Sequence, residues 1–170
     1  MVTYPPIKFE CQGSGKELVA EVIAQEIDPG HFDFNTRFSD GFEDTFIHER
    51  SGNWKAVRDK NGGYLERIKD DLSALLCYQV DRHYLSFPHK MGDEMVNIWV
   101  FETQREDGYM VYSKGGSKCY TIYYKGDYRF EMRKIAGAWY AKTVRYANPE
   151  IIDETLVAII GQMIDARIKE

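Results

Sequence analysis

The feature that most constrains this chain is a succession of short hydrophobic segments joined by turn sequences of only a few residues. In the segment 32–38 every second residue is Phe or Thr and the residues between them are polar, which is typical of a half-buried strand. The turns "SDG" and "SGN" then lead into segments at 42–49 and 54–57. Because a parallel pair of strands needs a connection of a dozen or more residues, these segments are predicted to form an antiparallel meander.

The strand pattern returns in the second half of the chain. A short first strand is predicted at 7–11, and later strands are predicted near 95–103, 109–113, 118–124, 128–135 and 138–145. The clearest of these contains "DYRFEMR" at 127–133, in which charged side chains alternate with aromatic or apolar ones. The segment 81–92 has the least regular pattern and is assigned to no element.

Three segments have the period of a helix instead. The first begins at a capping box formed by Ser14 and Glu17 and ends at the "DPG" of residues 28–30, with apolar residues at helical spacing between them. The second covers 64–77. The third begins at Asn148 and Pro149, because Asn can cap a helix and Pro suits its first position.

We therefore predict a single α+β domain spanning residues 1–170. Its core is one curved antiparallel sheet of about seven to eight strands with meander connections. The sheet packs against the C-terminal helix and the middle helix, since each must bury an apolar face, and a short N-terminal helix is added. "GNWKA" at 52–56 and "GAWYA" at 137–141 each precede a predicted helix, which indicates a weak internal duplication of 1–80 and 81–170.

Composition excludes several classes of protein. Hydrophobic residues make up 44% and charged residues 29% of the chain, which is ordinary for a soluble globular protein. No apolar run approaches the ~20 residues that cross a bilayer, and the first residues lack the pattern of a secretory signal. No CxxC pair occurs among the three cysteines, Cys11, Cys77 and Cys119, which predicts reduced thiols in a cytoplasmic protein. We expect the protein to bind neither a membrane nor a cofactor.

The stretch "ECQGSGKEL" at 10–18 resembles a phosphate-binding loop but lacks its required residues. A Walker loop needs a Gly five positions before the Gly-Lys pair and a hydroxyl after it, whereas this chain has Glu10 and Glu17 at those positions. The third glycine of a dinucleotide loop is replaced by Leu18. The glycines are therefore interpreted as the start of a capped helix.

The histidines allow one metal or acid–base alternative. Asp81 and His83 lie two residues apart, so they share a face if they are on a strand. Together with His89 they contain the two imidazoles and one carboxylate of a known type of metal site. This set is kept as the basis of an alternative hydrolase or metal enzyme. No catalytic motif accompanies it, so an enzyme is not the first interpretation.

A basic and aromatic stretch at 112–146 supports a nucleic-acid alternative. It contains eight Lys or Arg residues and only two acids. Aromatic faces can stack on bases while cations follow the phosphates of a single strand. The residues assigned to this alternative are Lys114, Lys118, Tyr120, Arg129, Arg133, Tyr140 and Arg145.

The first interpretation is a small acidic binding protein without catalytic activity, of the inhibitor or immunity type, that docks a basic protein partner. Residues 1–49 hold ten acids and three bases, a net charge of −7. Charge complementarity of this kind speeds association and sets specificity. The contact candidates are Asp33, Asp40, Glu43, Asp44 and Glu49. A small-ligand cavity between sheet and helix is a further alternative, which depends on void volume.

Overall fold

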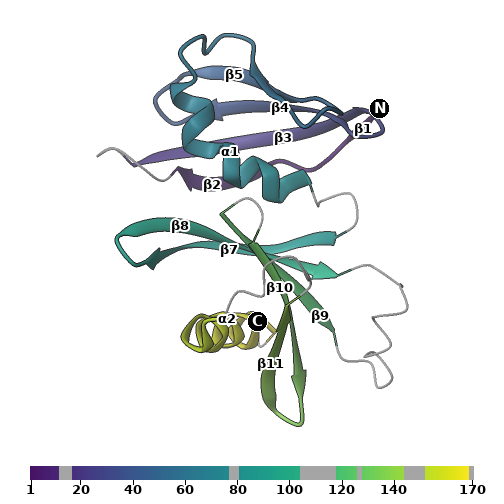
Figure 1. Ribbon diagram of the computed structural model, residues 1–170, viewed down its shortest axis with the longest axis vertical. Helices are drawn as coiled ribbons and strands as arrows, with labels where there is room; N and C mark the ends of the chain where they lie inside the picture. Colours follow the sequence, from purple (N-terminus) through teal and green to yellow (C-terminus); the bar gives the residue numbers. More distant parts are fainter. Residues whose placement is uncertain (12–16, 77–80, 104–117, 126–127, 144–151, 169–170) are drawn as a thin grey trace. The chain divides into compact units, whose positions relative to one another are not determined.

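The computed structural model describes residues 1–11, 17–76, 81–103, 118–125, 128–143 and 152–168. The chain divides into two compact units. The N-terminal unit comprises Met1–Leu76, Ser86–Ile98 and Tyr124–Asp127, and the C-terminal unit comprises Cys77–Leu85, Trp99–Tyr123 and Tyr128–Glu170. Each contains strands and one of the two described helices (Figure 1).

The first sheet has six strands and belongs to the N-terminal part of the chain. They are β1 (Val2–Thr3), β2 (Ile7–Cys11), β3 (Leu18–Asp28), β4 (His31–Phe38), β5 (Glu43–His48) and β6 (Trp54–Ala56). The order is β1-β3-β4-β5-β6, with β2 also paired to β3, and every pair is antiparallel. The predicted meander of the segments 32–38, 42–49 and 54–57 is therefore confirmed.

One face of this sheet is covered by α1 (Gly63–Leu75), the predicted middle helix (Figure 1). The core contains Phe34, Phe38 and Phe46 from the sheet, which are at most 2% exposed, and Ile68 and Leu72 from the helix, which are fully buried. The helical stripe places its apolar residues on the side that faces the sheet, since residues three and four apart lie on one side of a helix.

The second sheet has five strands. They are β7 (Asp81–Met91), β8 (Glu94–Thr103), β9 (Cys119–Tyr124), β10 (Tyr128–Ile135) and β11 (Ala138–Thr143), in the order β11-β10-β9-β8-β7. The registers of β8 with β9 and of β10 with β11 are antiparallel. The C-terminal helix α2 (Glu154–Ile168) buries Leu156, Ile160 and Ile164 completely.

The fold is α+β as predicted, but the prediction of one sheet of seven to eight strands was wrong. The strands form two sheets, because β6 is only three residues long and the helix α1 follows it. The chain then begins a new sheet, in which β7 lies at the edge. The prediction of a duplication between 1–80 and 81–170 stays a prediction, as does that of a single domain.

The predicted N-terminal helix was also wrong, because residues 18–28 form the strand β3. Leu18, Ala20, Val22 and Ala24 are buried in alternation, and β3 pairs with β4 through most of its length. The apolar residues of this segment fit both a period of 3.6 and a period of 2. The β-branched side chains between them favour the strand, and "DPG" closes a hairpin with Gly30 at a φ of 80°.

Two other boundaries differ from the sequence-based expectation. The segment 81–92, which was assigned to no element, forms β7. Its Pro88 lacks a backbone donor, which an edge strand tolerates. The helix α2 begins at Glu154, and the side chain of Asp153 accepts the backbone N–H of Thr155 at 2.9 Å as its cap. Asn148, Pro149 and the strand predicted at 109–113 lie outside the described residues.

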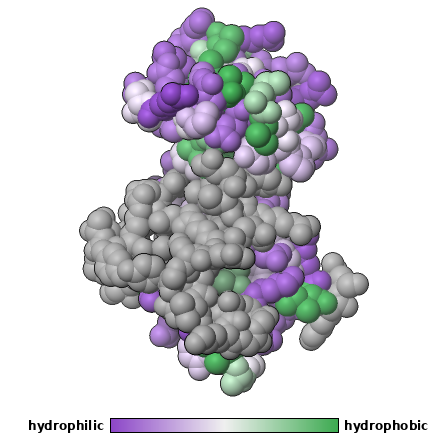
Figure 2. All heavy atoms as spheres, turned by 90° about the vertical axis from the view of Figure 1, so that its right-hand side faces the viewer, coloured by the Kyte–Doolittle hydropathy of each residue, from purple (hydrophilic) through white to green (hydrophobic). Residues whose placement is uncertain are grey.

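The described surface is mainly hydrophilic. Figure 2 shows small, separate apolar patches on a hydrophilic background over the described part of the face that it draws. None of the helices in the described ranges is long and apolar enough to cross a bilayer.

Candidate functional site

The candidate site is the face of the first sheet opposite α1, here called the open face. Side chains alternate between the two faces of a strand, so the residues between the buried ones of β3, β4 and β5 point to this side. The strand registers align them in rows across the sheet. One row contains Glu21, Arg37 and Glu43, and the next contains Ile23, Asn35 and Thr45.

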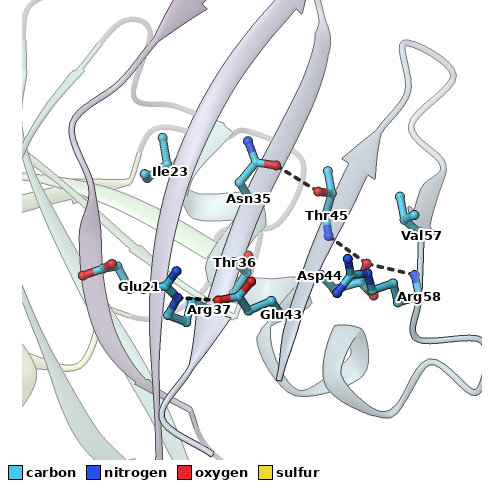
Figure 3. Close-up of a pocket in the computed structure, with 10 residues that line it drawn as sticks. All are labelled: Glu21, Ile23, Asn35, Thr36, Arg37, Glu43, Asp44, Thr45, Val57 and Arg58. Atoms are coloured by element: carbon cyan, nitrogen blue, oxygen red, sulfur yellow. Dashed lines mark hydrogen bonds and ion pairs between the residues drawn. The ribbon is translucent and has the colours of Figure 1, made fainter. Parts of the chain in front are cut away.

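The second of these rows is neutral and forms the centre of the open face (Figure 3). The hydroxyl of Thr45 donates to Oδ1 of Asn35 at 2.9 Å, and Nδ2 of Asn35 donates to Oε1 of Gln25 at 3.2 Å. Ile23 lies at one end of the row, and Val57, which is 50% exposed, lies at the other. The row therefore combines apolar ends with a fixed polar centre.

The first row is charged, and each of its three side chains is in an ion pair. Nε of Arg37 donates to Oε1 of Glu43 at 2.6 Å, as Figure 3 shows. On the next strand, Glu21 lies 3.1 Å from Nζ of Lys8. These pairs are exposed, so each contributes at most about 1 kcal/mol to folding. A partner can therefore replace one member of a pair at small cost.

Together the two rows line a hollow of about 500 Å³ (Figure 3). Its ten lining residues all come from β3, β4, β5 and the segment that follows β6: Glu21, Ile23, Asn35, Thr36, Arg37, Glu43, Asp44, Thr45, Val57 and Arg58. The hollow is thus built within the N-terminal unit. It is a recess on the face of a sheet.

Asp44 binds the backbone of the segment before α1, a structural role that the sequence did not indicate. It is only 6% exposed, and its carboxylate accepts the backbone N–H groups of Arg58 at 2.9 Å and Asp59 at 2.7 Å. The Asp59 carboxylate in turn accepts the N–H groups of Tyr64 at 2.7 Å and Leu65 at 3.2 Å. These are free donors in the first turn of α1, so Asp59 caps the helix and Asp44 holds the cap in place.

The other contact candidates lie on or beside the open face. Asp33 is on β4 and approaches Nε2 of His31 at 3.6 Å. Asp40 lies in the turn after β4, where the N–H of Phe42 and the hydroxyl of Tyr64 hold the pKa of its carboxyl below the ordinary value. Glu49 follows β5, and its hydrogen bond from Lys55 at 2.5 Å lowers the pKa of its carboxyl.

The structure therefore brings Asp33 and Glu43 onto one face, with Asp40 and Glu49 beyond the ends of the strands and Asp44 engaged with backbone. Sequence reasoning missed Arg37, Asn35 and Thr45. These side chains became visible as a set only through the pairing register of β4 with β5. The alternation along β4 placed Asn35 and Arg37 on the polar side, but no local signal aligned them with β5.

The nucleic-acid alternative stays a prediction, because only four of its seven side chains are described. Arg133 and Tyr140 are register partners on β10 and β11, and Tyr140 is 54% exposed. Tyr120 is 1% exposed, packs its ring 5.9 Å from that of Trp139, and has its pKa raised by burial to about 12. Lys118 lies 3.6 Å from Glu102. Lys114, Arg145 and the Arg129 side chain lie outside the described residues.

The metal alternative also finds no assembled site within the described ranges. No group of three or more His, Cys, Asp or Glu side chains there could hold a metal ion. His83 packs 5.6 Å from the ring of Trp99, and burial, followed by the charge of Arg167, lowers its pKa to about 4. His89 lies 6.4 Å from the ring of Phe87, and the Asp81 side chain is not among those described. This site stays a prediction.

The glycine-rich segment also has a different context from the one expected. It joins β2 to β3, which pair antiparallel from Cys11 and Leu18 onward. A strand therefore follows it where a capped helix was expected. A phosphate loop needs a helix at this position, because the helix N-terminus binds the anion. The residues 12–16 themselves lie outside the described ranges.

Comparison of the chain with protein-family models, curated proteins and solved structures finds no match.

Proposed function

We propose that this chain is a non-enzymatic binding protein that docks a basic protein partner on the open face of its first sheet. The observation that carries the proposal is the hollow of about 500 Å³ on that face, with a neutral central row beside a row of paired charges. A small acidic binding protein of the inhibitor or immunity type would use such a face directly.

The pairing of the polar groups favours binding over catalysis at this face. Glu43 lies 2.6 Å from Nε of Arg37 and Glu21 lies 3.1 Å from Nζ of Lys8, so both carboxylates are already engaged in ion pairs. Asn35 and Thr45 are fixed by each other, and fixed polar groups lose little freedom on binding.

Charge favours a basic partner. The net charge of residues 1–49 is −7, and Glu43 and Asp33 lie on the open face. A cationic side chain of the partner would compete with Arg37 for Glu43, and the apolar ends of the central row would contact aliphatic parts of the partner. Long-range attraction of this kind mainly raises the association rate and falls with added salt.

The experiment selects random peptides from a display library on the immobilised full chain and measures the binding of the winners. The variant Thr45→Arg fills the centre of the open face, and Thr155→Arg, on the exposed first turn of α2, is the matched control. We expect winners rich in Lys and Arg that bind the wild type and the control but lose at least tenfold in affinity for Thr45→Arg. A selection in which no winner loses affinity for Thr45→Arg would overturn the proposal.

Charge reversal tests the electrostatic part separately. Glu43→Lys should slow the association of these peptides at low salt, whereas Glu66→Lys on α1, which covers the other face of the sheet, should leave the rate nearly unchanged. Equal association rates for both variants would remove the basic partner from the proposal while leaving the docking face.

A further inference from the structure

A second hollow, in the C-terminal unit, has features that the open face lacks. It has a volume of about 570 Å³ and lies between β11 and α2. On the strand side it touches three consecutive residues, Trp139, Tyr140 and Ala141. Because consecutive residues of a strand point to opposite faces, a hollow that touches all three runs along the edge of the strand.

That edge belongs to the last strand of the sheet. Among the described strands the order ends at β11, which is paired on one side to β10 from Phe130↔Thr143 to Ile135↔Ala138. The other edge of a terminal strand presents backbone N–H and C=O groups that can pair with a further strand. β11 contains no proline, and its Lys142 is the only charged residue that could discourage such pairing.

The helix supplies the other wall with one stripe of side chains. Glu154, Ala158, Gln162 and Asp165 follow each other at spacings of three or four residues, so they lie on one side of α2. The twelve residues from Glu154 to Asp165 extend about 16 Å along the helix axis. An extended peptide of about five residues has the same length.

The charges of this groove are of one sign. Its lining contains the carboxylates of Glu154 and Asp165 and no Lys or Arg. Asp165 is engaged, since it accepts hydrogen bonds from Nζ of Lys134 at 2.8 Å and Nε1 of Trp139 at 3.2 Å. Glu154 has no ion-pair partner among the described residues. The groove is thus complementary to a cation near the N-terminus of α2.

We propose that the groove between β11 and α2 binds an extended segment of a partner protein as an additional strand on β11, with a Lys or Arg of that segment at Glu154. Main-chain pairing with β11 supplies affinity, and alternate side chains of the segment enter the groove over Trp139 and Ala158. Gln162, at the middle of the stripe, can donate to and accept from the backbone of the segment. This site is separate from the open face.

The experiment uses the full chain and a display library of random heptapeptides, with binding of the winners measured on three variants. Ala158→Arg fills the groove and neutralises Glu154, whereas Ala166→Arg places the same side chain on α2 outside the groove. We expect peptides with alternating apolar residues and a Lys or Arg, whose affinity falls at least tenfold for Ala158→Arg and less than twofold for Ala166→Arg. Replacing that Lys by norleucine should weaken binding to the wild type but not to Glu154→Gln.

Main-chain pairing has its own readout. Only every second backbone N–H of an added strand points toward β11. Methylation of this set of peptide nitrogens should abolish binding because it removes the donors, whereas methylation of the other set should not. The proposal would be overturned by a selection in which no winner loses affinity for Ala158→Arg, so that every winner binds this variant as well as the wild type or is lost only with Thr45→Arg. The proposal would also be overturned if the protein without peptide forms a dimer that the Ala158→Arg substitution dissociates, because the groove is then filled by a second copy of this chain.

Discussion

The two units of this molecule attach a helix to an antiparallel sheet by different means. In the N-terminal unit, α1 is positioned through its first turn, where Asp59 caps the helix and Asp44 holds the residues before it. In the C-terminal unit, α2 is positioned through its middle. The Trp139 ring of β11 approaches Gly161 so closely that an added Cβ would lie 2.4 Å from Cδ1 of the ring.

The polar attachment of α1 and the steric attachment of α2 are sensitive to different kinds of substitution. The first depends on the hydrogen bonds of the buried Asp44 carboxylate and the half-buried Asp59 carboxylate, and it fails when an acceptor is removed. The second depends on the absence of one methyl group, and it fails when an atom is added.

Removal of the Asp44 carboxylate should have the largest effect. Asp44→Ala leaves the backbone N–H groups of Arg58 and Asp59 without their charged acceptor, which we expect to lower the free energy of unfolding by about 3 kcal/mol. Urea unfolding followed by circular dichroism measures this change. Asp70→Ala, on the exposed side of α1, is the control and should change stability by less than about 0.5 kcal/mol. A similar loss for both variants would mean that Asp44 is not the anchor.

Addition of a methyl group to α2 should have the next largest effect. Gly161→Ala forces the added Cβ against Trp139 and should destabilise the C-terminal unit by about 2 kcal/mol. The intrinsic helix propensity of Ala would by itself stabilise the helix by about 1 kcal/mol. Gly63→Ala, in α1, is the matched control, because nothing lies within 4 Å of the added atom. The unfolding temperatures of both variants measure these effects. A Gly161→Ala protein that is more stable than the wild type would refute the close contact between Gly161 and the Trp139 ring.

Removal of the cap alone should have a smaller effect. Asp59→Ala deletes the acceptor for Tyr64 and Leu65 and should cost about 1 kcal/mol. Its effect should be non-additive with that of Asp44→Ala, since Asp44 holds the residue that carries the cap. A double-mutant cycle in urea measures the coupling. Strict additivity would show that the two carboxylates act independently.

Substitution of His83 should have the smallest effect at neutral pH, and its effect should appear on acidification. The pKa of His83 is about 4 in the folded protein because of burial, against 6.5 for an exposed histidine. Between these values the unfolded chain binds a proton that the folded protein does not, so stability is complete above pH 6.5 and falls as the pH is lowered toward 4. His83→Gln should remove this part of the acid dependence, measured as unfolding midpoints from pH 7 to 4.

His31 provides the comparison for that experiment. It lies 3.6 Å from Asp33, on the surface of the N-terminal unit. His31→Gln should therefore leave the acid dependence attributed to His83 in place. If His83→Gln and the wild type lose stability in parallel over this range, His83 is not the buried group responsible.

The fold could be predicted wherever one period described the hydrophobic pattern. The strand β4 and the first six residues of β10 alternate, and α1 carries a single apolar stripe, while β5 was delimited by the turns "SDG" and "SGN" on either side of it. The segment Leu18–Asp28 fits both periods, and only its pairing with β2 and β4 selects the strand. β7 was missed because Pro88 weakens the strand pattern, although proline is tolerated at the sheet edge where β7 lies.

The candidate site was less predictable than the fold. Composition indicated an acidic N-terminal region, and Glu43 and Asp33 do lie on the open face. The paired cation Arg37 and the neutral row of Asn35 and Thr45 depend on which residues face each other across strands. A one-residue change of register would exchange every side chain between the faces, so this information is absent from any local segment.

The most direct test of the open face is amide chemical-shift mapping of the isotope-labelled full chain with a Lys-rich peptide selected on it. We expect amide chemical-shift changes in β3, β4 and β5 that are concentrated around Asn35 and Thr45 and are lost in the Thr45→Arg variant. Shifts confined to α1 or to the C-terminal unit would contradict this expectation.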